Sequence, residues 1–395
     1  MRAELFTSTR FGSLTTRPLS AWPHSYFLPE PMPRELELRP ETVASVSRAD
    51  LALGRLSGLA LLVDDPDLLL GPAMAQEALS SSRIEGTQAS LSEVLSVANE
   101  DAPILDDNLR EVSNYLGALR QGSELLPSLP LTQRFLCALH ATLLTDVRGE
   151  EKSPGSLRTS PVWIGSPNAR PETAKFIPPH QDHLGDLLAD WERFVNQPSS
   201  MPPVLRCALS HYQFETIHPF LDGNGRIGRL LIGFQLIADG ILTAPILHIS
   251  GYFERHRDAY YDRLQAVRER GEIEEWVQFF CAAVEEQANL SASRIRALVE
   301  TRERYRRESA GDRSALPAVI DIIFRNPVVT VSSVMRALSV SQPTASAALR
   351  KAERRGWLRS AGRWGRGAKE RWIATEVWAA VTGNTDLNED PGASR

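Results

Sequence analysis

The chain has 395 residues, of which 42% are hydrophobic, and its formal net charge is −5 at pH 7. This length predicts two or three domains with buried cores, and the apolar runs are far shorter than the ~18 residues that a membrane-spanning helix needs. Three widely spaced cysteines argue against a disulfide framework and a cysteine metal site, and the N-terminus has no apolar signal-peptide core. We therefore expect a reduced, cytoplasmic protein that does not bind a membrane.

The net charge hides an asymmetry along the chain. Residues 314–375 contain eleven Lys or Arg and three Asp or Glu, so this segment is basic while the remainder is acidic. An acidic body joined to a basic C-terminal module predicts two separate tasks.

Helical periodicity dominates after the first forty residues, which are proline-rich and are expected to lie extended over the body of the protein. Apolar residues at helical spacing predict a helix through residues 51–62, and Pro72 is expected to open a second helix at a first-turn position. Further amphipathic helices are predicted in three ranges: residues 108–126, 131–144 and 204–217.

One strand signal stands out among the helices. Val162, Trp163 and Ile164 are followed by a cluster of Gly, Ser, Pro and Asn, and a short return covers residues 175–177. β-branched and aromatic residues on both sides of a turn cluster predict an exposed β-hairpin.

The segment "TIHPFLDGNGRIGRLL", residues 216–231, concentrates the chemically useful residues. Gly223, Gly225 and Gly228 form a GxGxxG pattern, but a dinucleotide fold requires a strand before it and an acidic residue about 20 positions later, and neither is present. The pattern instead predicts a helix, a tight loop and a second helix. This loop places backbone N–H groups of Gly223, Asn224 and Gly225 at the positive end of the second helix, where anions bind.

Charged side chains around the loop suit a polyphosphate and a metal ion. Arg226 and Arg229 lie about one helical turn apart and supply fixed positive charge for phosphate oxygens. Asp222 can hold Mg²⁺ through one carboxylate while the phosphates supply other ligands, and His218 can accept the proton of an attacking hydroxyl. The competing interpretation is a helix-capping loop with a buried histidine and two surface arginines.

The motif "HPFLDGNGRIGR" resembles the signature of the Fic proteins, H-x-F-x-[DE]-G-N-G-R-x-x-R, at every defined position. "PGSLR" at residues 154–158 resembles the segment before the family's target-binding flap, and "YYDRL" and "EEWVQFF" resemble the helices after its core. The resemblance covers roughly residues 40–290. It implies a mainly α fold, a Fic-type helical bundle with a small β-hairpin flap, which transfers AMP from ATP to a Ser, Thr or Tyr hydroxyl of a protein and releases pyrophosphate.

The same resemblance implies roles for individual residues. His218 is expected to be the general base and Asp222 the Mg²⁺ ligand. The expected ATP-binding residues are the following: Gly223, Asn224, Gly225, Arg226, Gly228, Arg229, Tyr260 and Tyr261. For the two tyrosines, which would lie near the adenine, packing in the core is an equally common explanation.

The predicted hairpin resembles the flap of the family, which pairs with a target segment as an added strand. Val162, Trp163 and Ile164 are therefore the expected target-binding residues. A purely structural hairpin remains the alternative.

A second motif lies upstream of the signature. "SSRIEG", residues 81–86, resembles the family's inhibitory motif [ST]-x-x-x-E-[GN], with Ser81, Glu85 and Gly86 at the defined positions. Ser81 and Glu85 are one helical turn apart, and Gly86 is expected to end their helix. If Glu85 forms a bidentate pair with Arg229, it occupies the donors that would orient the γ-phosphate, so we expect autoinhibition. The alternative is a solvated glutamate at a helix end.

The basic C-terminal segment reads as three helices followed by two strands with a Gly- and Arg-rich turn, which predicts a winged helix-turn-helix domain. In a DNA reader the third helix enters the major groove and the wing meets phosphates. The expected contact residues are Thr344, Ser346, Arg350, Arg363, Arg366 and Lys369. A protein-docking module with the same fold is the alternative, and the sequence does not decide between them.

The sequence thus predicts five parts: an N-terminal segment with the inhibitory helix (1–100), the Fic catalytic core (101–290), a linker helix (291–313), the winged helix-turn-helix domain (314–378) and a disordered tail (379–395). The expected partners are ATP with Mg²⁺ and a protein substrate, which is either another protein or the chain itself. Removal of AMP from a modified protein and a DNA-binding regulator with a nucleotide-sensing core are the alternative functions. A monomer and a homodimer are both left open.

Overall fold

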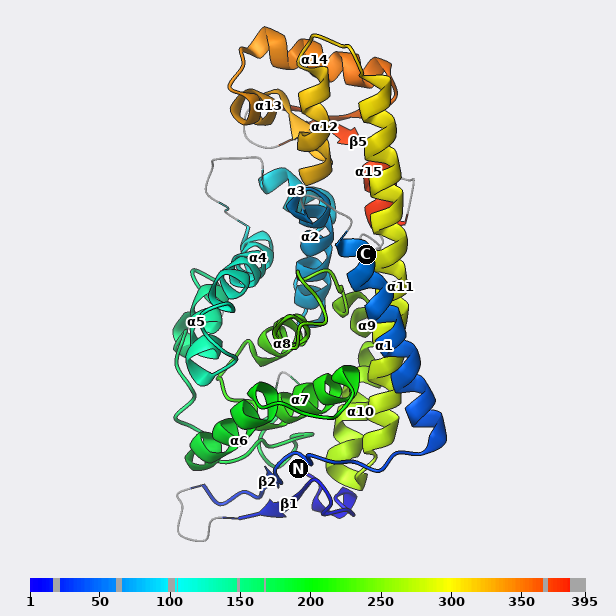
Figure 1. Cartoon of the computed structure of the whole chain (residues 1–395). Coiled ribbons are helices and arrows are strands. Elements are labelled where there is room, and N and C mark those ends of the chain that lie inside the picture. The colour runs from blue at the N-terminus through cyan, green and yellow to red at the C-terminus, as the bar shows by residue number, and fades with distance from the viewer. Residues whose placement is uncertain are drawn as a thin grey trace. The chain divides into compact units, whose positions relative to one another are not determined.

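The computed structural model describes residues 1–16, 22–61, 66–98, 104, 106–147, 150–166, 168–364 and 369–383. Helices dominate, and the strands form two small antiparallel sheets (Figure 1). The mainly α fold class expected from the sequence is therefore confirmed. In the described part of the chain, no helix has both the length and the apolar composition needed to cross a membrane.

The chain divides into two compact units. The first consists of Met1–Gly54 and Asn114–Ala288, and the second of Arg55–Ser113 and Asn289–Arg395. Three long helices continue from one unit into the other: α1 (Pro40–Ala60), α4 (Asp107–Leu125) and α11 (Ile273–Glu308). Because α11 is continuous, residues 291–308 do not form a separate linker helix. The five-part division itself stays a prediction.

The first unit contains helices grouped around one central helix. Its elements, besides parts of the long helices, are β1 (Gly12–Thr15), β2 (Tyr26–Pro29), α5 (Gln133–Leu143), α6 (Leu184–Asn196), α7 (Pro203–Ile217), α8 (Asn224–Ala238), α9 (Ser250–Arg255), α10 (Arg257–Arg270) and short 3₁₀ turns at Ala3–Leu5, Glu150–Lys152 and Gln181–His183. Helices α7 and α8 lie side by side (Figure 1).

Helix α7 is the centre of this unit, because every residue from Val204 to Ile217 is buried. The sequence predicted an amphipathic helix here, with only one apolar face. Polar residues on the other face are buried as well, and they must find hydrogen-bond partners inside the protein. Pro202 precedes the first turn and Pro203 lies in it, where the missing N–H costs little.

The N-terminal segment is extended, as expected, but it also forms a small antiparallel sheet. Strand β1 pairs with β2 in the register Gly12↔Pro29, and the N–H of Phe27 donates to the carbonyl oxygen of Ile177 at 3.0 Å. The predicted hairpin is reduced to a single bridge between Ile164 and Phe176. The return of this hairpin thus contacts the N-terminal sheet.

The second unit contains α2 and the C-terminal elements. Its elements are α2 (Pro66–Ile84), α3 (Leu91–Val97), α12 (Leu316–Arg325), β3 (Val328–Thr330), α13 (Val331–Leu338), α14 (Gln342–Arg354), β4 (Leu358–Trp364), β5 (Lys369–Ala374) and α15 (Thr375–Thr382). The expectation that Pro72 opens a helix is wrong, because α2 begins at Pro66 and Pro72 lies inside it. Helix α2 packs on α12, and a Cβ added to Gly71 would lie 2.7 Å from the carbonyl oxygen of Arg325.

The basic segment packs into a core formed by α12, α13, α14 and a sheet of strand order β3-β5-β4, together with residues of α11 and α15. The three helices and the two strands read from the sequence are present, and the short strand β3 is an addition. The winged helix-turn-helix assignment stays a prediction. Residues 379–382 of the expected tail belong to α15, whereas residues 384–395 lie outside the described residues, as does Arg366.

Candidate active site

His218 lies at the point where α7 ends and the signature loop begins. Its backbone adopts φ 50° and ψ 63°, the left-handed conformation, which is uncommon for a residue other than glycine. Pro219 follows and cannot continue the helix, so the sequence itself forces the chain to leave α7 here. The turn directs the histidine away from the helix axis.

Arg158, a buried residue of a distant segment, holds this turn through hydrogen bonds. Its Nε donates to the carbonyl oxygen of His218 at 2.8 Å, and its Nη2 donates to those of Pro179 at 2.6 Å and Ile217 at 3.3 Å. The N–H of Arg158 also donates to the carbonyl oxygen of Pro219 at 3.0 Å. The planar guanidinium thereby satisfies carbonyl groups at the C-terminal end of α7, which have no partner within the helix.

The surroundings of His218 keep its imidazole neutral. Burial and then the positive charges of Arg158 and Arg268 lower the pKa of His218 to about 3. Its Nδ1 is buried, and the imidazole has a backbone hydrogen bond with Glu215, so we expect Nε2 to be the nitrogen that meets a ligand. A neutral imidazole is the form that accepts a proton.

The loop between His218 and α8 is closed by Asn224. Its side-chain oxygen accepts from the N–H of Phe220 at 2.9 Å, and its side-chain nitrogen donates to the carbonyl oxygen of Phe220 at 2.9 Å. Gly223 adopts the left-handed conformation with φ +75°, which favours glycine. Asn224 therefore shapes the loop with its side chain, in addition to providing the first backbone N–H of α8.

The start of α8 supplies the donors of the predicted anion cradle. The helix begins at Asn224, so the N–H groups of Asn224, Gly225 and Arg226 belong to its first turn and have no acceptor within the helix. The N–H of Gly223 instead donates to Oδ1 of Asp222 at 2.5 Å. Two of the three expected N–H groups, those of Asn224 and Gly225, thus lie in the first turn of α8, and their role in anion binding stays a prediction.

Arg226 is the residue whose surroundings best fit the predicted anion site at this helix end. Its side chain is almost fully buried, yet Nε and Nη1 have no hydrogen-bond partner among the described residues. Its Nη2 lies 3.8 Å from Oδ1 of Asp222. Unsatisfied guanidinium groups are costly when buried, and a phosphate would satisfy them. Arg229, one turn further along α8, is also buried.

Asp222 fits the role of a Mg²⁺ ligand. Its side chain is 41% exposed beside the first turn of α8. The described residues contain no group of three or more His, Cys, Asp or Glu that could hold a metal alone. Mg²⁺ is commonly bound by one carboxylate together with phosphate oxygens and water, so a single exposed carboxylate suffices.

Gly228, the third glycine of the GxGxxG pattern, has a packing role. A Cβ at this position would lie 2.3 Å from Oε1 of Glu215 and 3.2 Å from Cδ1 of Phe214. Its carbonyl oxygen lies 3.1 Å from Nδ1 of His211. Glycine therefore allows α8 to approach α7 closely, which is the physical reason for glycine here; an ATP contact for Gly228 stays a prediction.

The two candidate adenine residues differ in exposure. Tyr260 is fully buried, its hydroxyl lies 2.9 Å from Nε2 of His211, and its ring stacks on Phe253 at 4.5 Å between centroids. Tyr261 is 37% exposed, and Arg257 lies over its ring at 5.5 Å. Burial favours the packing interpretation for Tyr260, and an adenine contact for either residue stays a prediction.

The predicted flap residues lie at the hairpin bridge. The N–H of Ile164 donates to the carbonyl oxygen of Phe176 at 2.8 Å. Trp163 is 42% exposed and its ring stacks on Trp22 at 5.9 Å, with Val162 as its partly exposed neighbour. A target-binding role for Val162, Trp163 and Ile164 stays a prediction.

The predicted inhibitory motif lies at the C-terminal end of α2, in the second unit. Ser81 is buried within the helix, and α2 ends at Ile84. The N–H of Glu85 donates to the carbonyl oxygen of Ser82, and the N–H of Gly86 donates to that of Arg83, both at 3.0 Å. Gly86 has φ +98°. The expected helix end is therefore present, while its inhibitory role stays a prediction.

Sequence reasoning missed three residues that support the site. His140 of α5 contacts the signature loop, His211 joins α7 to Tyr260, and Arg268 of α10 stacks over Phe176 at 3.9 Å. Burial lowers the pKa of His140 to about 4 and that of His211 to about 3. A histidine at an apolar-face position of a predicted helix is the sequence signal that could have drawn attention to the first two.

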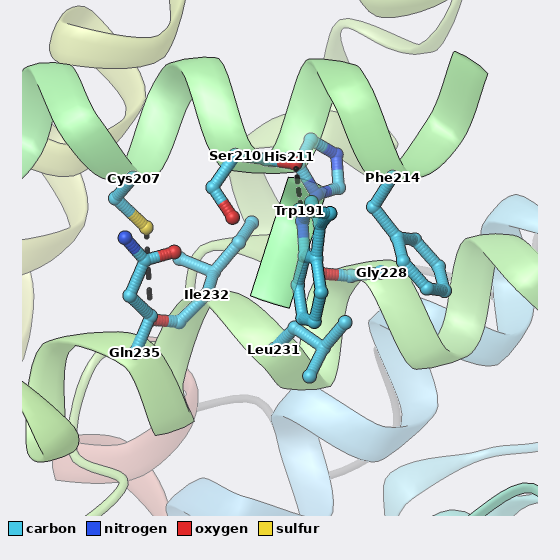
Figure 2. A pocket seen from close by; sticks show the side chains of 9 residues that line it. All are labelled: Trp191, Cys207, Ser210, His211, Phe214, Gly228, Leu231, Ile232 and Gln235. Atoms are coloured by element: carbon cyan, nitrogen blue, oxygen red, sulfur yellow. Dashed lines mark hydrogen bonds between the residues drawn. The ribbon is translucent and has the colours of Figure 1, made fainter. Parts of the chain in front are cut away.

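A small cavity lies between α7 and α8 (Figure 2). It has no room for even one water molecule, whereas ligand pockets typically measure about 300 Å³ or more. Its lining residues come from α6, α7 and α8: Trp191, Cys207, Ser210, His211, Phe214, Gly228, Leu231, Ile232 and Gln235. This cavity is a narrow gap in the packed core and cannot hold a nucleotide.

Two family models match adjacent parts of the chain. Residues 43–124 match the model described as Fic/DOC family N-terminal, and residues 130–236 match the model described as Fic/DOC family. The second match contains the signature loop and most of α8.

Similar proteins carry the same family name. The chain is 30% identical over 225 residues to a protein named protein adenylyltransferase Fic from Culex quinquefasciatus, and 29% identical over 224 residues to one of the same name from Drosophila grimshawi. Each match covers 55% of this chain, and 41% and 43% of the two relatives, so the chain spans less than half of their length. A Fic family protein from Desulfovibrio desulfuricans G20 has a similar structure, with a TM-score of 0.56, 22% identity and coverage of 86% of this chain and 97% of that chain. At this identity the structural likeness concerns the fold.

Proposed function

We propose that this chain, which belongs to the Fic/DOC family, transfers AMP from ATP to a hydroxyl group of a protein and releases pyrophosphate. The observation that carries the proposal is the start of α8. There the first-turn N–H groups and the buried, unsatisfied nitrogens of Arg226 form an anion site directly after His218 and Asp222 in the chain. The relatives are named protein adenylyltransferase, and these names indicate that the transferred group is AMP.

The residues divide the work of the transfer. The first-turn N–H groups of α8 and the guanidinium groups of Arg226 and Arg229 bind the outer phosphates, which turns the α-phosphorus toward the attacking hydroxyl. Mg²⁺, held by Asp222, neutralises charge on the phosphates when it is bound. Nε2 of His218 takes the proton from the attacking hydroxyl.

The bonds balance in a single displacement. The hydroxyl oxygen forms a bond to the α-phosphorus while the bond from that phosphorus to the bridging oxygen of the β-phosphate breaks. The proton moves to His218 and the electron pair leaves with pyrophosphate. The triphosphate brings negative charge near His218, which stabilises the imidazolium that results.

The test uses the whole chain with ATP and Mg²⁺. We expect intact-mass spectrometry to detect the mass of one or more AMP groups on the chain or on an added protein fraction, together with released pyrophosphate. Incubation of an AMP-modified protein with the same chain tests the reverse reaction. Loss of AMP without any addition from ATP would contradict the proposal.

We also propose that Glu85 restrains this transfer. The support is the pattern of Ser81, Glu85 and Gly86 in the sequence, together with the turn that ends α2 at these residues. A pair between Glu85 and Arg229, inferred from the sequence, would compete with the γ-phosphate for the same guanidinium. Relief of inhibition by Glu85→Gly is the corresponding test.

For the C-terminal module we propose DNA binding. The order of helices and strands supports it, as do Thr344 and Arg350, which are exposed on α14. Lys351 and Arg355 of the same helix lie near Asp312, at 2.5 Å and 3.8 Å, so they are less available to phosphates. We expect a gel shift with random-sequence duplex DNA that falls steeply with salt and weakens in Arg350→Ala. No shift at 50 mM salt would contradict DNA binding and favour a protein-docking module.

A further inference from the structure

His140 of α5 joins the signature loop to a segment that precedes the flap. It is fully buried, and its ring stacks on that of Phe220 at 3.9 Å between centroids and 8° between planes. Its Nε2 lies 3.0 Å from the carbonyl oxygen of Asp222, and the N–H of Gly155 donates to its Nδ1 at 2.9 Å. Both ring nitrogens and one ring face are therefore engaged.

These contacts fix which nitrogen carries the proton. A backbone N–H can only donate, so Nδ1 of His140 must accept from Gly155. In a neutral imidazole the other nitrogen is then the donor, and Nε2–H donates to the carbonyl oxygen of Asp222. Gly155 thus sets the tautomer that the contact with the loop requires.

The peptide that His140 holds is one that could otherwise rotate. The bond between Asp222 and Gly223 is planar and trans, so its carbonyl oxygen and its N–H point in opposite directions. Gly223 has φ +75°, and glycine populates positive and negative φ about equally. A rotation of this peptide would exchange the two directions, as happens between the related turn types I and II.

Such a rotation would matter for phosphate binding. As it stands, the carbonyl oxygen of Asp222 faces His140, and the N–H of Gly223 points the other way, toward Oδ1 of Asp222. After rotation the negative end of the peptide dipole would take the place of this N–H beside the first turn of α8. An oxygen in that place repels a phosphate that the helix N-terminus attracts.

We propose that His140 is a positioning residue for nucleotide binding, which holds the Asp222–Gly223 peptide with its carbonyl oxygen turned away from the phosphates. The inference rests on the proposed function of the loop as a phosphate site. The segment that anchors His140 also holds the other end of the loop, because Arg158 binds the carbonyl oxygens of Ile217 and His218. One segment, residues 154–158, therefore fixes both ends of the loop.

Two substitutions separate the contacts of His140. In His140→Gln the amide nitrogen can take the place of Nε2 and donate to Asp222, whereas the acceptor for Gly155 is lost. In His140→Asn the shorter side chain can accept from Gly155 but cannot reach Asp222. Both remove the stacking on Phe220, so each variant is the matched control for the other.

The measurement is binding of Mg·ATP, Mg·pyrophosphate and adenosine by titration calorimetry, in the otherwise wild-type chain and in Glu85→Gly. We expect His140→Asn to raise the Kd of both phosphate ligands about five- to tenfold, with little change for adenosine. We expect His140→Gln to stay within about threefold of the parent chain. Equal losses in the two variants, or an equal loss for adenosine, would overturn the proposal.

The tautomer gives a second test that needs no substitution. In the wild-type chain with ¹⁵N-labelled histidine, we expect the NMR signals of His140 to report the proton on Nε2, and a proton on Nδ1 would overturn the proposal even if His140→Asn does not fold. The binding assay also separates the two proposals. A chain that binds Mg·ATP but transfers no AMP contradicts the proposed function, while the comparison of the two variants still decides the role of His140.

Discussion

The close approach of α8 to α7 at Gly228 makes a quantitative prediction about Gly228→Ala. The new Cβ would lie 2.3 Å from Oε1 of Glu215 and 3.2 Å from Cδ1 of Phe214, both on side chains that are buried. A contact of 2.3 Å cannot persist, so the Glu215 carboxylate must move within a closely packed core. Overpacking of this kind costs about 1–3 kcal/mol in the free energy of unfolding, and the lower part of that range applies because Oε1 is the far end of a flexible side chain.

The opposing effect comes from helix propensity. Alanine stabilises the interior of a helix by roughly 0.5–1 kcal/mol relative to glycine. Gly233 lies in the same helix, and a Cβ there would meet nothing within 4 Å. Gly233→Ala is therefore the matched control: it gains the propensity without the clash. The difference between the two variants isolates the clash and should lie in the lower part of the range of about 1–3 kcal/mol.

The assay is urea unfolding of the two variants and the wild type, followed by circular dichroism. We expect Gly228→Ala to unfold at lower urea than wild type, and Gly233→Ala at the same or higher urea. Because α8 carries the anion site at its first turn, Gly228→Ala should also weaken Mg·ATP binding, whereas Gly233→Ala should not. Equal stability of the two variants would refute the argument from the Glu215 contact.

Four further predictions concern the site and its surroundings. His218→Ala should abolish AMP transfer and leave Mg·ATP affinity in calorimetry largely intact, since the imidazole acts on the attacking hydroxyl; transfer at the wild-type rate would remove it from the mechanism. Arg226→Ala should weaken ATP binding and Asp222→Ala the Mg²⁺-dependent activity, each by roughly 1.5–3 kcal/mol, and unchanged affinity in both would mean that the cradle is wrongly assigned. Glu85→Gly should raise incorporation of labelled AMP into the chain; a folded, ATP-binding variant that is no more active than wild type would contradict inhibition. Burial lowers the pKa of His211 to about 3 in the folded chain, so as the pH falls below ~6.5 the unfolded state binds a proton before the folded state does. The free energy of unfolding should therefore fall by up to ~1.4 kcal/mol per pH unit because of this group. In urea unfolding between pH 6.5 and 5, His211→Gln should lose stability less steeply than wild type.

The sequence predicted the local structure of the signature segment correctly. A helix, a tight loop and a second helix follow from Pro219, the glycines and the apolar spacing on both sides, and the structure contains all three. These features depend on hydrogen bonds and steric limits between residues close in the chain. Spacing along the sequence therefore translates directly into position in space.

Other predictions from local pattern were less accurate, and the reasons differ. Pro72 was expected to open a helix, yet α2 starts at Pro66 and continues through it, so the local preference of proline did not decide the helix start. The sequence did not show that the glycine at position 228 lies against Glu215 and Phe214 of α7, and its predicted ATP contact stays a prediction. Tyr260 and Tyr261 are adjacent in sequence, and only the packing of α10 shows that one is buried and the other exposed.

What the sequence by itself determined is thus the proximity of the candidate site groups: His218, Asp222 and Arg226 are held together by a few peptide bonds, and no tertiary contact is needed to bring them near each other. What only the tertiary structure decided is how these groups are held. His140 is 82 residues from Asp222, and Arg158 is 60 residues from His218, and both act through backbone carbonyl oxygens, which every residue has. A side chain that binds a carbonyl oxygen leaves no pattern in the sequence of its partner, because the partner's residue type does not matter. Such contacts arise from the packing of α5, α7 and α8, and they become visible only when the helices are in place.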